Sequence, residues 1–288
     1  MDPNEKREYL RPFRCVGGFI LIYLILANAI AALSSSLFVI SSYIPLSTSI
    51  LESIVSLISY IINIYCFYLG YRIFFKRYDI PLIKKEKLRK KDFLPSILCI
   101  ITVSLITRGI WKYWFDILGT SMEQDSFVNI VDILYVCIIA PIIEEIIFRG
   151  WIVTVLKKYN PYCAILFSAF TFGLIHGNIY QAIPAFFIGI MLGYMVIRFN
   201  SLIPTIVTHA IINTTSVVSS LLQLSFPEIF YQATLVLTLL FILVLIIIYR
   251  KKLKSGLKGV AGTSYLPIYS ISFLFSILVY IAMIILTK

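Results

Sequence analysis

The chain has 288 residues, of which 60% are hydrophobic and 14% charged, and its mean hydropathy is +0.94. A soluble globular domain carries about 25% charged residues, so the composition excludes an ordinary soluble domain. The formal net charge of +11 does not indicate a nucleic-acid-binding protein, because the basic residues cluster between hydrophobic runs. We therefore expect an all-α, polytopic transmembrane helix bundle whose main partner is the lipid bilayer.

Apolar runs of about 18 or more residues predict membrane-spanning helices, and the chain contains a series of them. The first three lie near 16–40, 49–74 and 93–118, within an N-terminal part that we bound at residues 1–127. No clear small-residue cleavage site ends the first run, so we interpret it as a retained span and not as a signal peptide. The basic segment Lys84 to Lys91 between the second and third runs indicates a cytoplasmic loop.

Six further runs complete the predicted bundle. Those of the central part (128–216) lie near 128–156, 162–177, 180–197 and 202–222, and those of the C-terminal part (217–288) near 229–249 and 265–287. The runs that begin at 162 and 180 are short, so we expect eight or nine spans. With a cytoplasmic N-terminus, most basic residues fall on the inner side of the membrane, and the predicted outer loops are acidic or neutral. The pattern predicts a multi-pass membrane protein with its N-terminus in the cytoplasm.

The fourth run contains a charged group in the middle of an apolar segment: Glu144, Glu145 and Arg149. A charge at the bilayer centre costs roughly 2.5–3.5 kcal/mol on insertion scales, so such residues usually have a function. Glu145 and Arg149 are four residues apart and can pair on one helix face. Glu144 points about 100° away from Glu145, so it is the carboxylate that is free to meet another helix. Pro141 removes one backbone hydrogen bond just before this group and loosens the helix there.

The only two histidines of the chain, His176 and His209, also lie in apolar segments. Asn213 follows His209 by four residues, so both point the same way. Counting about 1.5 Å per residue from the cytoplasmic ends places Glu144, His176 and His209 at depths of about 20, 22 and 14 Å. These depths fit one cavity within a hydrocarbon core about 30 Å thick. A purely structural ion pair would account for Arg149 and one glutamate but would leave the second carboxylate without a partner.

Three motifs follow one another in this region: EExxxR (Glu144, Glu145, Arg149), FxxxH (Phe172, His176) and HxxxN (His209, Asn213). Together they resemble the CPBP family of intramembrane proteases, which groups CAAX prenyl endopeptidases with bacterial Abi-type proteins. The resemblance covers roughly residues 128–216, and every motif position is filled. It implies an endopeptidase that cuts a membrane-associated peptide or protein, and we expect a bacterial cell membrane as its location.

The resemblance also implies roles for the motif residues. Glu144 with His176 would activate the attacking water, and His209 with Asn213 would stabilise the oxyanion. Glu145 and Arg149 would support them structurally. The residue chemistry agrees, because a carboxylate can act as a general base, which typically accelerates a reaction by a factor of about 10²–10⁴. An amide N–H in an oxyanion hole contributes about 2.7–4 kcal/mol.

Three alternatives stay open at this stage. We expect no cofactor, but Glu144, His176 and His209 could hold zinc with an open position for water, and Glu145 would then be the base. A non-proteolytic immunity or regulatory protein could use the same scaffold. A transporter could use the buried carboxylates and histidines as a relay, although no inverted repeat supports it.

Overall fold

The computed structural model describes residues 3–41, 48–76 and 129–222, together with positions 97, 100, 101, 104, 109 and 236. Every secondary-structure element in these residues is a helix, as expected from the composition. The predicted span near 265–287, the span near 229–249 except position 236, and most of the span near 93–118 lie outside the described residues. Among the residues that the structure does describe, two helices are long and apolar enough to cross a membrane, Ile50–Ile73 and Ile179–Phe199. The total of eight or nine spans therefore stays a prediction.

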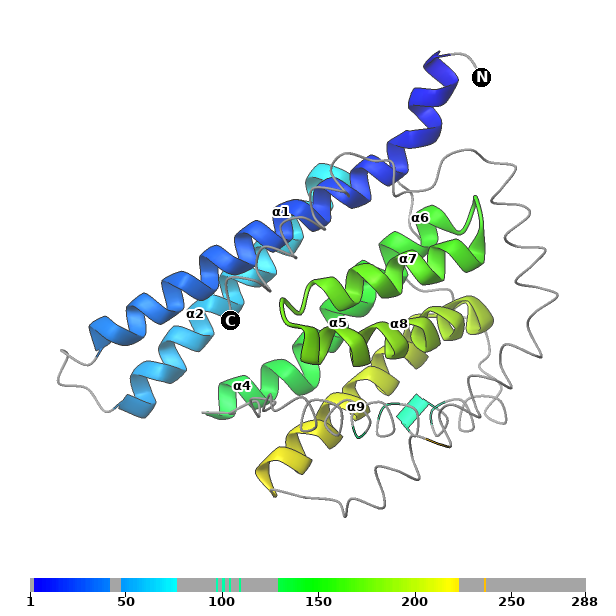
Figure 1. Ribbon diagram of the computed structural model, residues 1–288. Helices are drawn as coiled ribbons and strands as arrows, with labels where there is room; N and C mark the ends of the chain where they lie inside the picture. Colours follow the sequence, from blue (N-terminus) through cyan, green and yellow to red (C-terminus); the bar gives the residue numbers. More distant parts are fainter. Residues whose placement is uncertain are drawn as a thin grey trace.

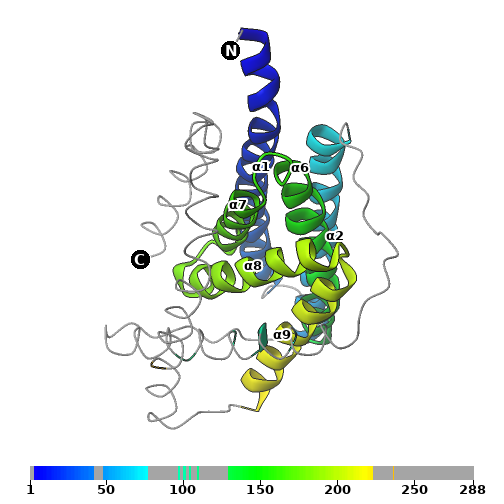
Figure 2. The ribbon, with the colours of Figure 1, turned by 90° about the vertical axis from the view of Figure 1, so that its right-hand side faces the viewer.

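The first two helices, α1 (Pro3–Ser41) and α2 (Thr48–Gly70), lie side by side (Figures 1 and 2). The short π-helical stretch η1 (Tyr71–Phe75) continues α2. The helix α1 begins at Pro3, well before the predicted apolar run, and therefore includes the charged N-terminal segment. At about 1.5 Å per residue it is about 58 Å long. The apolar stretch of α2 is only 6% buried, and such an apolar surface is suited to lipid and not to water.

A continuous helix from Ile130 to Leu156 covers the predicted run 128–156. Its consecutive parts are α4 (Ile130–Leu134), η2 (Tyr135–Ile139), α5 (Ala140–Glu145), η3 (Ile146–Val153) and α6 (Thr154–Leu156). Asn129 starts it, because its side-chain oxygen accepts hydrogen bonds from the first free backbone N–H groups. The parts η2 and η3 are π-helical, and such stretches often occur at functional sites. They lie on either side of the two glutamates.

The helices α7 (Pro161–Leu174) and α8 (Ile179–Phe199) form a tightly packed hairpin (Figure 1). Gly173 permits this packing, since a Cβ there would lie 2.7 Å from the carbonyl oxygen of Ala182. Gly177 has a φ of 71°, the left-handed conformation that the turn between the helices requires. With 14 residues, α7 is about 21 Å long, shorter than a hydrocarbon core of about 30 Å. We therefore expect the turn that carries His176 to lie inside the membrane.

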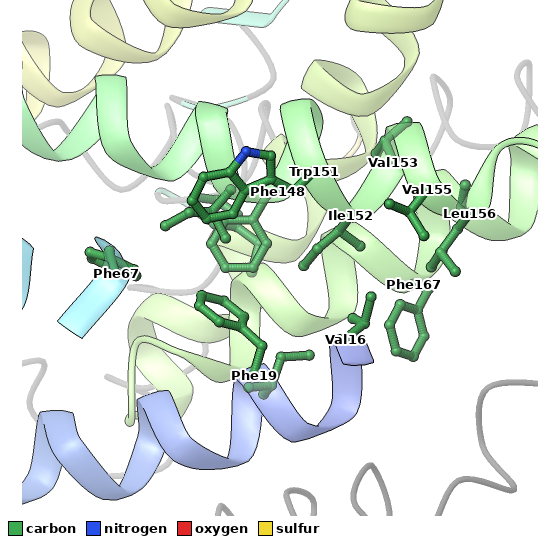
Figure 3. Close-up of a cluster of buried hydrophobic side chains, with 14 of the residues drawn as sticks. Val16, Phe19, Phe67, Phe148, Trp151, Ile152, Val153, Val155, Leu156 and Phe167 are labelled. Atoms are coloured by element: carbon green, nitrogen blue, oxygen red, sulfur yellow. The ribbon is translucent and has the colours of Figure 1, made fainter. Parts of the chain in front are cut away.

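A cluster of large apolar side chains joins α1, α2, η3 and α7 (Figure 3). Phe19 of α1 points toward Phe148 and Trp151 of η3, with 6.4 Å between the ring centroids of Phe19 and Trp151. Within lipid, helices associate through close van der Waals packing and not through exclusion of water. A second cluster packs α8 against the last described helix, α9 (Ile203–Leu221). The two clusters hold the helix from Ile130 to Leu156, the hairpin and α9 around the charged residues.

Candidate active site

The predicted ion pair between Glu145 and Arg149 is present and fully buried. Arg149 Nη1 donates to Glu145 Oε1 at 2.8 Å, and both side chains are 0% exposed. Arg149 Nη2 also donates to the Gly189 carbonyl oxygen at 3.2 Å. Truncating one partner of such a pair leaves an unpaired buried charge, which costs about 3–5 kcal/mol. The hydrogen bond from Arg149 to Gly189 therefore ties the helix from Ile130 to Leu156 to α8, and Glu145 holds the guanidinium group in place for it.

Gly189 is a site residue that the sequence analysis missed. A Cβ at this position would lie 2.9 Å from Ala169 Cα and 3.4 Å from Arg149 Nη2. Only a glycine brings this backbone close enough to α7 and to the guanidinium group at the same time. The only signal in the sequence was a glycine within an apolar helix, which does not reveal its partner.

His209 bridges the two glutamates. Its Nδ1 lies 2.9 Å from Glu145 Oε1, and its Nε2 lies 3.6 Å from Glu144 Oε2. Because a carboxylate oxygen accepts, Nδ1 carries the hydrogen, and the Nε2 edge faces Glu144. His209 is 4% exposed, whereas the Glu144 side chain is 19% exposed. Glu144 is therefore the more accessible of the two carboxylates, and Glu145 orients both Arg149 and His209.

Phe172 packs against both histidines and the arginine. Its ring meets those of His176 and His209 edge to face, with centroid separations of 5.1 Å and 5.6 Å. The guanidinium carbon of Arg149 lies 4.6 Å from the same ring, within the range of a cation–π contact. Phe172 is 2% exposed. The aromatic position of the second motif therefore links Arg149 and the two histidines, which lie on three separate elements.

His176 lies in the turn after α7, where the hydrogen bond of its ring determines its tautomer. Nδ1 lies 2.8 Å from the carbonyl oxygen of Phe172. A carbonyl can only accept, so Nδ1 carries a hydrogen. The pairing of His176 with Glu144 stays a prediction.

Asn213 lies one turn after His209 on α9, as its spacing predicted. Its Nδ2 donates to the carbonyl oxygen of Val136 at 2.9 Å, so one of its two amide hydrogens is used on the backbone of η2. The contribution of Asn213 to an oxyanion hole stays a prediction.

The zinc alternative requires Glu144, His176 and His209 to lie together around one ion. Within the part of the chain that the structure describes, no group of three or more His, Cys, Asp or Glu side chains is arranged to hold a metal ion. Glu144, His176 and His209 are therefore not grouped as metal ligands here. The choice between a metal-free and a zinc-dependent reaction stays a prediction.

An apolar groove of about 410 Å³ runs beside the site, between α9 and the helix that carries the glutamates. Its lining residues are Cys137, Ile138, Ile142, Ile206, Val207, Ala210, Ile211, Thr214 and Thr215. These side chains come from the faces of η2, α5 and α9 next to the faces that carry Asn213 and His209. The groove offers an apolar surface adjacent to a polar centre.

Comparison with known proteins identifies the central segment. Residues 126–215 match the family of type II CAAX prenyl endopeptidase Rce1-like proteins. No curated protein and no solved structure matches the chain. The matched residues include all three motifs, from Glu144 to Asn213. The match supports a relationship of residues 126–215 to the CAAX-type intramembrane proteases.

Proposed function

We propose that the protein is an intramembrane endopeptidase that hydrolyses a peptide bond of a membrane-associated substrate. The arrangement of Glu144, Glu145 and His209 carries this proposal. One carboxylate is fully buried and orients an imidazole, and the second, partly exposed carboxylate lies beside that imidazole. A purely structural ion pair needs Glu145 and Arg149 but has no use for a second, accessible carboxylate.

In the proposed reaction, Glu144 removes a proton from water, and the resulting hydroxide attacks the carbonyl carbon of the peptide. His176 would help to orient the same water through its Nε2 atom, since its Nδ1 is bonded to the Phe172 carbonyl. The C–N bond then breaks as the proton held by Glu144 passes to the leaving amine nitrogen. Each positioned acid–base group contributes about 10²–10⁴ in rate.

We propose that His209 and Asn213 stabilise the oxyanion of the tetrahedral intermediate. His209 in its doubly protonated form would donate from Nε2, the edge that faces Glu144. Asn213 would donate its second amide hydrogen, since the first is bonded to Val136. A single donor of this kind contributes about 2.7–4 kcal/mol to transition-state stabilisation.

The apolar groove supports a substrate with an apolar, membrane-embedded portion next to the scissile bond. The distribution of basic residues supports a multi-pass protein with a cytoplasmic N-terminus, which we propose lies in a bacterial cell membrane.

The test compares the N-terminal peptides of cellular proteins between cells that carry the wild type and cells that carry Glu144→Gln. We expect at least one cleavage product that disappears in Glu144→Gln and in His176→Ala. Glu52→Gln in α2 is the matched control and should leave the product unchanged. If both site variants produce the same peptides as the wild type, the protease proposal is wrong and a regulatory or immunity role is supported.

A further inference from the structure

The hydrogen bond from Asn213 Nδ2 to the Val136 carbonyl oxygen joins helices that are 77 residues apart in the chain. It is a side chain–backbone bond from α9 to η2, and its length of 2.9 Å is that of a well-formed hydrogen bond. A helical carbonyl is normally occupied by the N–H four residues later. Some feature of this helix must therefore leave the Val136 carbonyl oxygen able to accept the hydrogen bond from Asn213.

Two features of the helix leave the Val136 carbonyl oxygen without its regular donors. The donor of an α-helix would be the N–H of Ala140, but that N–H bonds to the Tyr135 carbonyl, five residues back. The donor of a π-helix would be the next N–H, and the next residue is Pro141, which has none. At membrane depth no bulk water replaces a lost donor, so such a carbonyl needs a partner from another element.

We infer that Pro141 and Asn213 form a matched pair, in which the proline frees the Val136 carbonyl and the asparagine binds it. The bond fixes the axial and rotational position of α9 against η2 and α5. His209 lies one helical turn before Asn213 on α9, and Glu144 lies about one turn after Pro141. The hydrogen bond between Asn213 and Val136 therefore helps to place the His209 imidazole against Glu144 and Glu145. Through this bond Asn213 is a positioning residue, in addition to the role proposed for its second hydrogen.

This inference deepens the proposed function. Only the expected effect of the Pro141–Asn213 pairing on activity rests on the proposed function. The pairing itself concerns the folded structure and can be measured without a substrate. An asparagine that served only as an oxyanion donor would be independent of Pro141. An asparagine that occupies the carbonyl freed by a proline becomes dispensable for stability when that proline is replaced by a residue with an N–H.

The experiment is a double-mutant cycle with Asn213→Ala and Pro141→Ala, measured as thermal unfolding of the full chain in detergent micelles. In the wild-type background Asn213→Ala should lower Tm by about 5 °C, because it leaves a buried carbonyl unpaired. In the Pro141→Ala background the N–H of residue 141 can bind within its own helix, and the drop should be at most half as large. Thr214→Ala is the control, since its hydroxyl bonds the Ala210 carbonyl of its own helix.

Equal drops in Tm in both backgrounds would overturn the inference. If Asn213→Ala does not fold at all in the wild-type background, recovery of folded protein by Pro141→Ala supports the pairing, and failure in both backgrounds refutes it. Cleavage by the wild type separates the two proposals. Additive Tm values with a cleaving wild type refute the pairing alone, whereas coupled Tm values without any cleavage product refute the protease alone.

Discussion

The imidazole of His209 is bonded to Glu145 across the interface of α9 and α5, with 2.9 Å between Nδ1 and Oε1. The same oxygen accepts a hydrogen bond from Arg149 at 2.8 Å. One buried carboxylate thus orients a cation on its own helix and an imidazole on another. This leaves Glu144, the adjacent and more exposed glutamate, in contact with the opposite edge of His209.

Replacing one member of the buried pair should destabilise the protein strongly. We expect Arg149→Met and Glu145→Gln each to lower the free energy of unfolding by about 3–5 kcal/mol, because each leaves a buried charge unpaired. The double variant should lose less than the sum of the two. Chemical unfolding in detergent measures all three. Additive losses would show that Glu145 and Arg149 are not coupled, in contradiction to the 2.8 Å contact.

The ring of Phe172 should matter for more than its volume. Phe172→Leu keeps much of the apolar volume but removes the aromatic face on which Arg149 and both histidines pack. We expect a loss of about 1–2 kcal/mol in stability together with at least a tenfold loss of cleavage. Phe170→Leu on the same helix is the control, because Phe170 is 39% exposed. Equal activities of the two variants would exclude a special role for Phe172.

Two glycines of α8 should differ in their tolerance of a methyl group. A Cβ at Gly189 would lie 2.9 Å from the Cα of Ala169, which is backbone and cannot move freely. A Cβ at Gly193 would meet the Ile165 side chain at 3.0 Å, and that side chain can shift. We expect Gly189→Ala to cost about 1–3 kcal/mol and Gly193→Ala clearly less, as measured by thermal unfolding. The reverse order would contradict the packing of α7 on α8.

A polar and aromatic contact connects α2 to the helix that carries the glutamates. The Tyr60 hydroxyl donates to Asp132 Oδ1 at 2.7 Å, and its ring stacks on Tyr135 with 3.7 Å between centroids. Tyr60→Phe keeps the stacking and loses the hydrogen bond, so it should cost about 1–3 kcal/mol. Tyr65→Phe should be neutral, since Tyr65 is 58% exposed. A neutral Tyr60→Phe in the same unfolding assay would argue against this contact.

The spacing of residues in the sequence was sufficient to predict the pairing of Glu145 with Arg149 and the shared face of His209 and Asn213. Both pairs are four residues apart, and helix geometry alone brings them together. The main helical segments also followed from the apolar runs. The charged N-terminal segment was an exception, because α1 continues through it.

The contacts between helices could not be predicted in the same way. That His209 binds Glu145 depends on how α9 is rotated against α5, and no local pattern determines that rotation. The sequence predicted that Pro141 removes one backbone hydrogen bond but not that η2 is π-helical, so it did not show that the carbonyl left free is that of Val136. The motif FxxxH singled out Phe172, but its contacts with Arg149 and with His209 depend on the packing of separate helices and could not be predicted.

Hydrolysis at Glu144 is tested most directly in reconstituted vesicles prepared in H₂¹⁸O, with the substrate that the comparison of N-terminal peptides reveals. For the wild type and the Glu52→Gln control, we expect a product whose new carboxylate carries ¹⁸O, detected by mass spectrometry. For Glu144→Gln we expect no product above background, at a level of folded protein that thermal unfolding confirms. Labelled product formed by Glu144→Gln at the wild-type rate would contradict the assignment of Glu144 as the base.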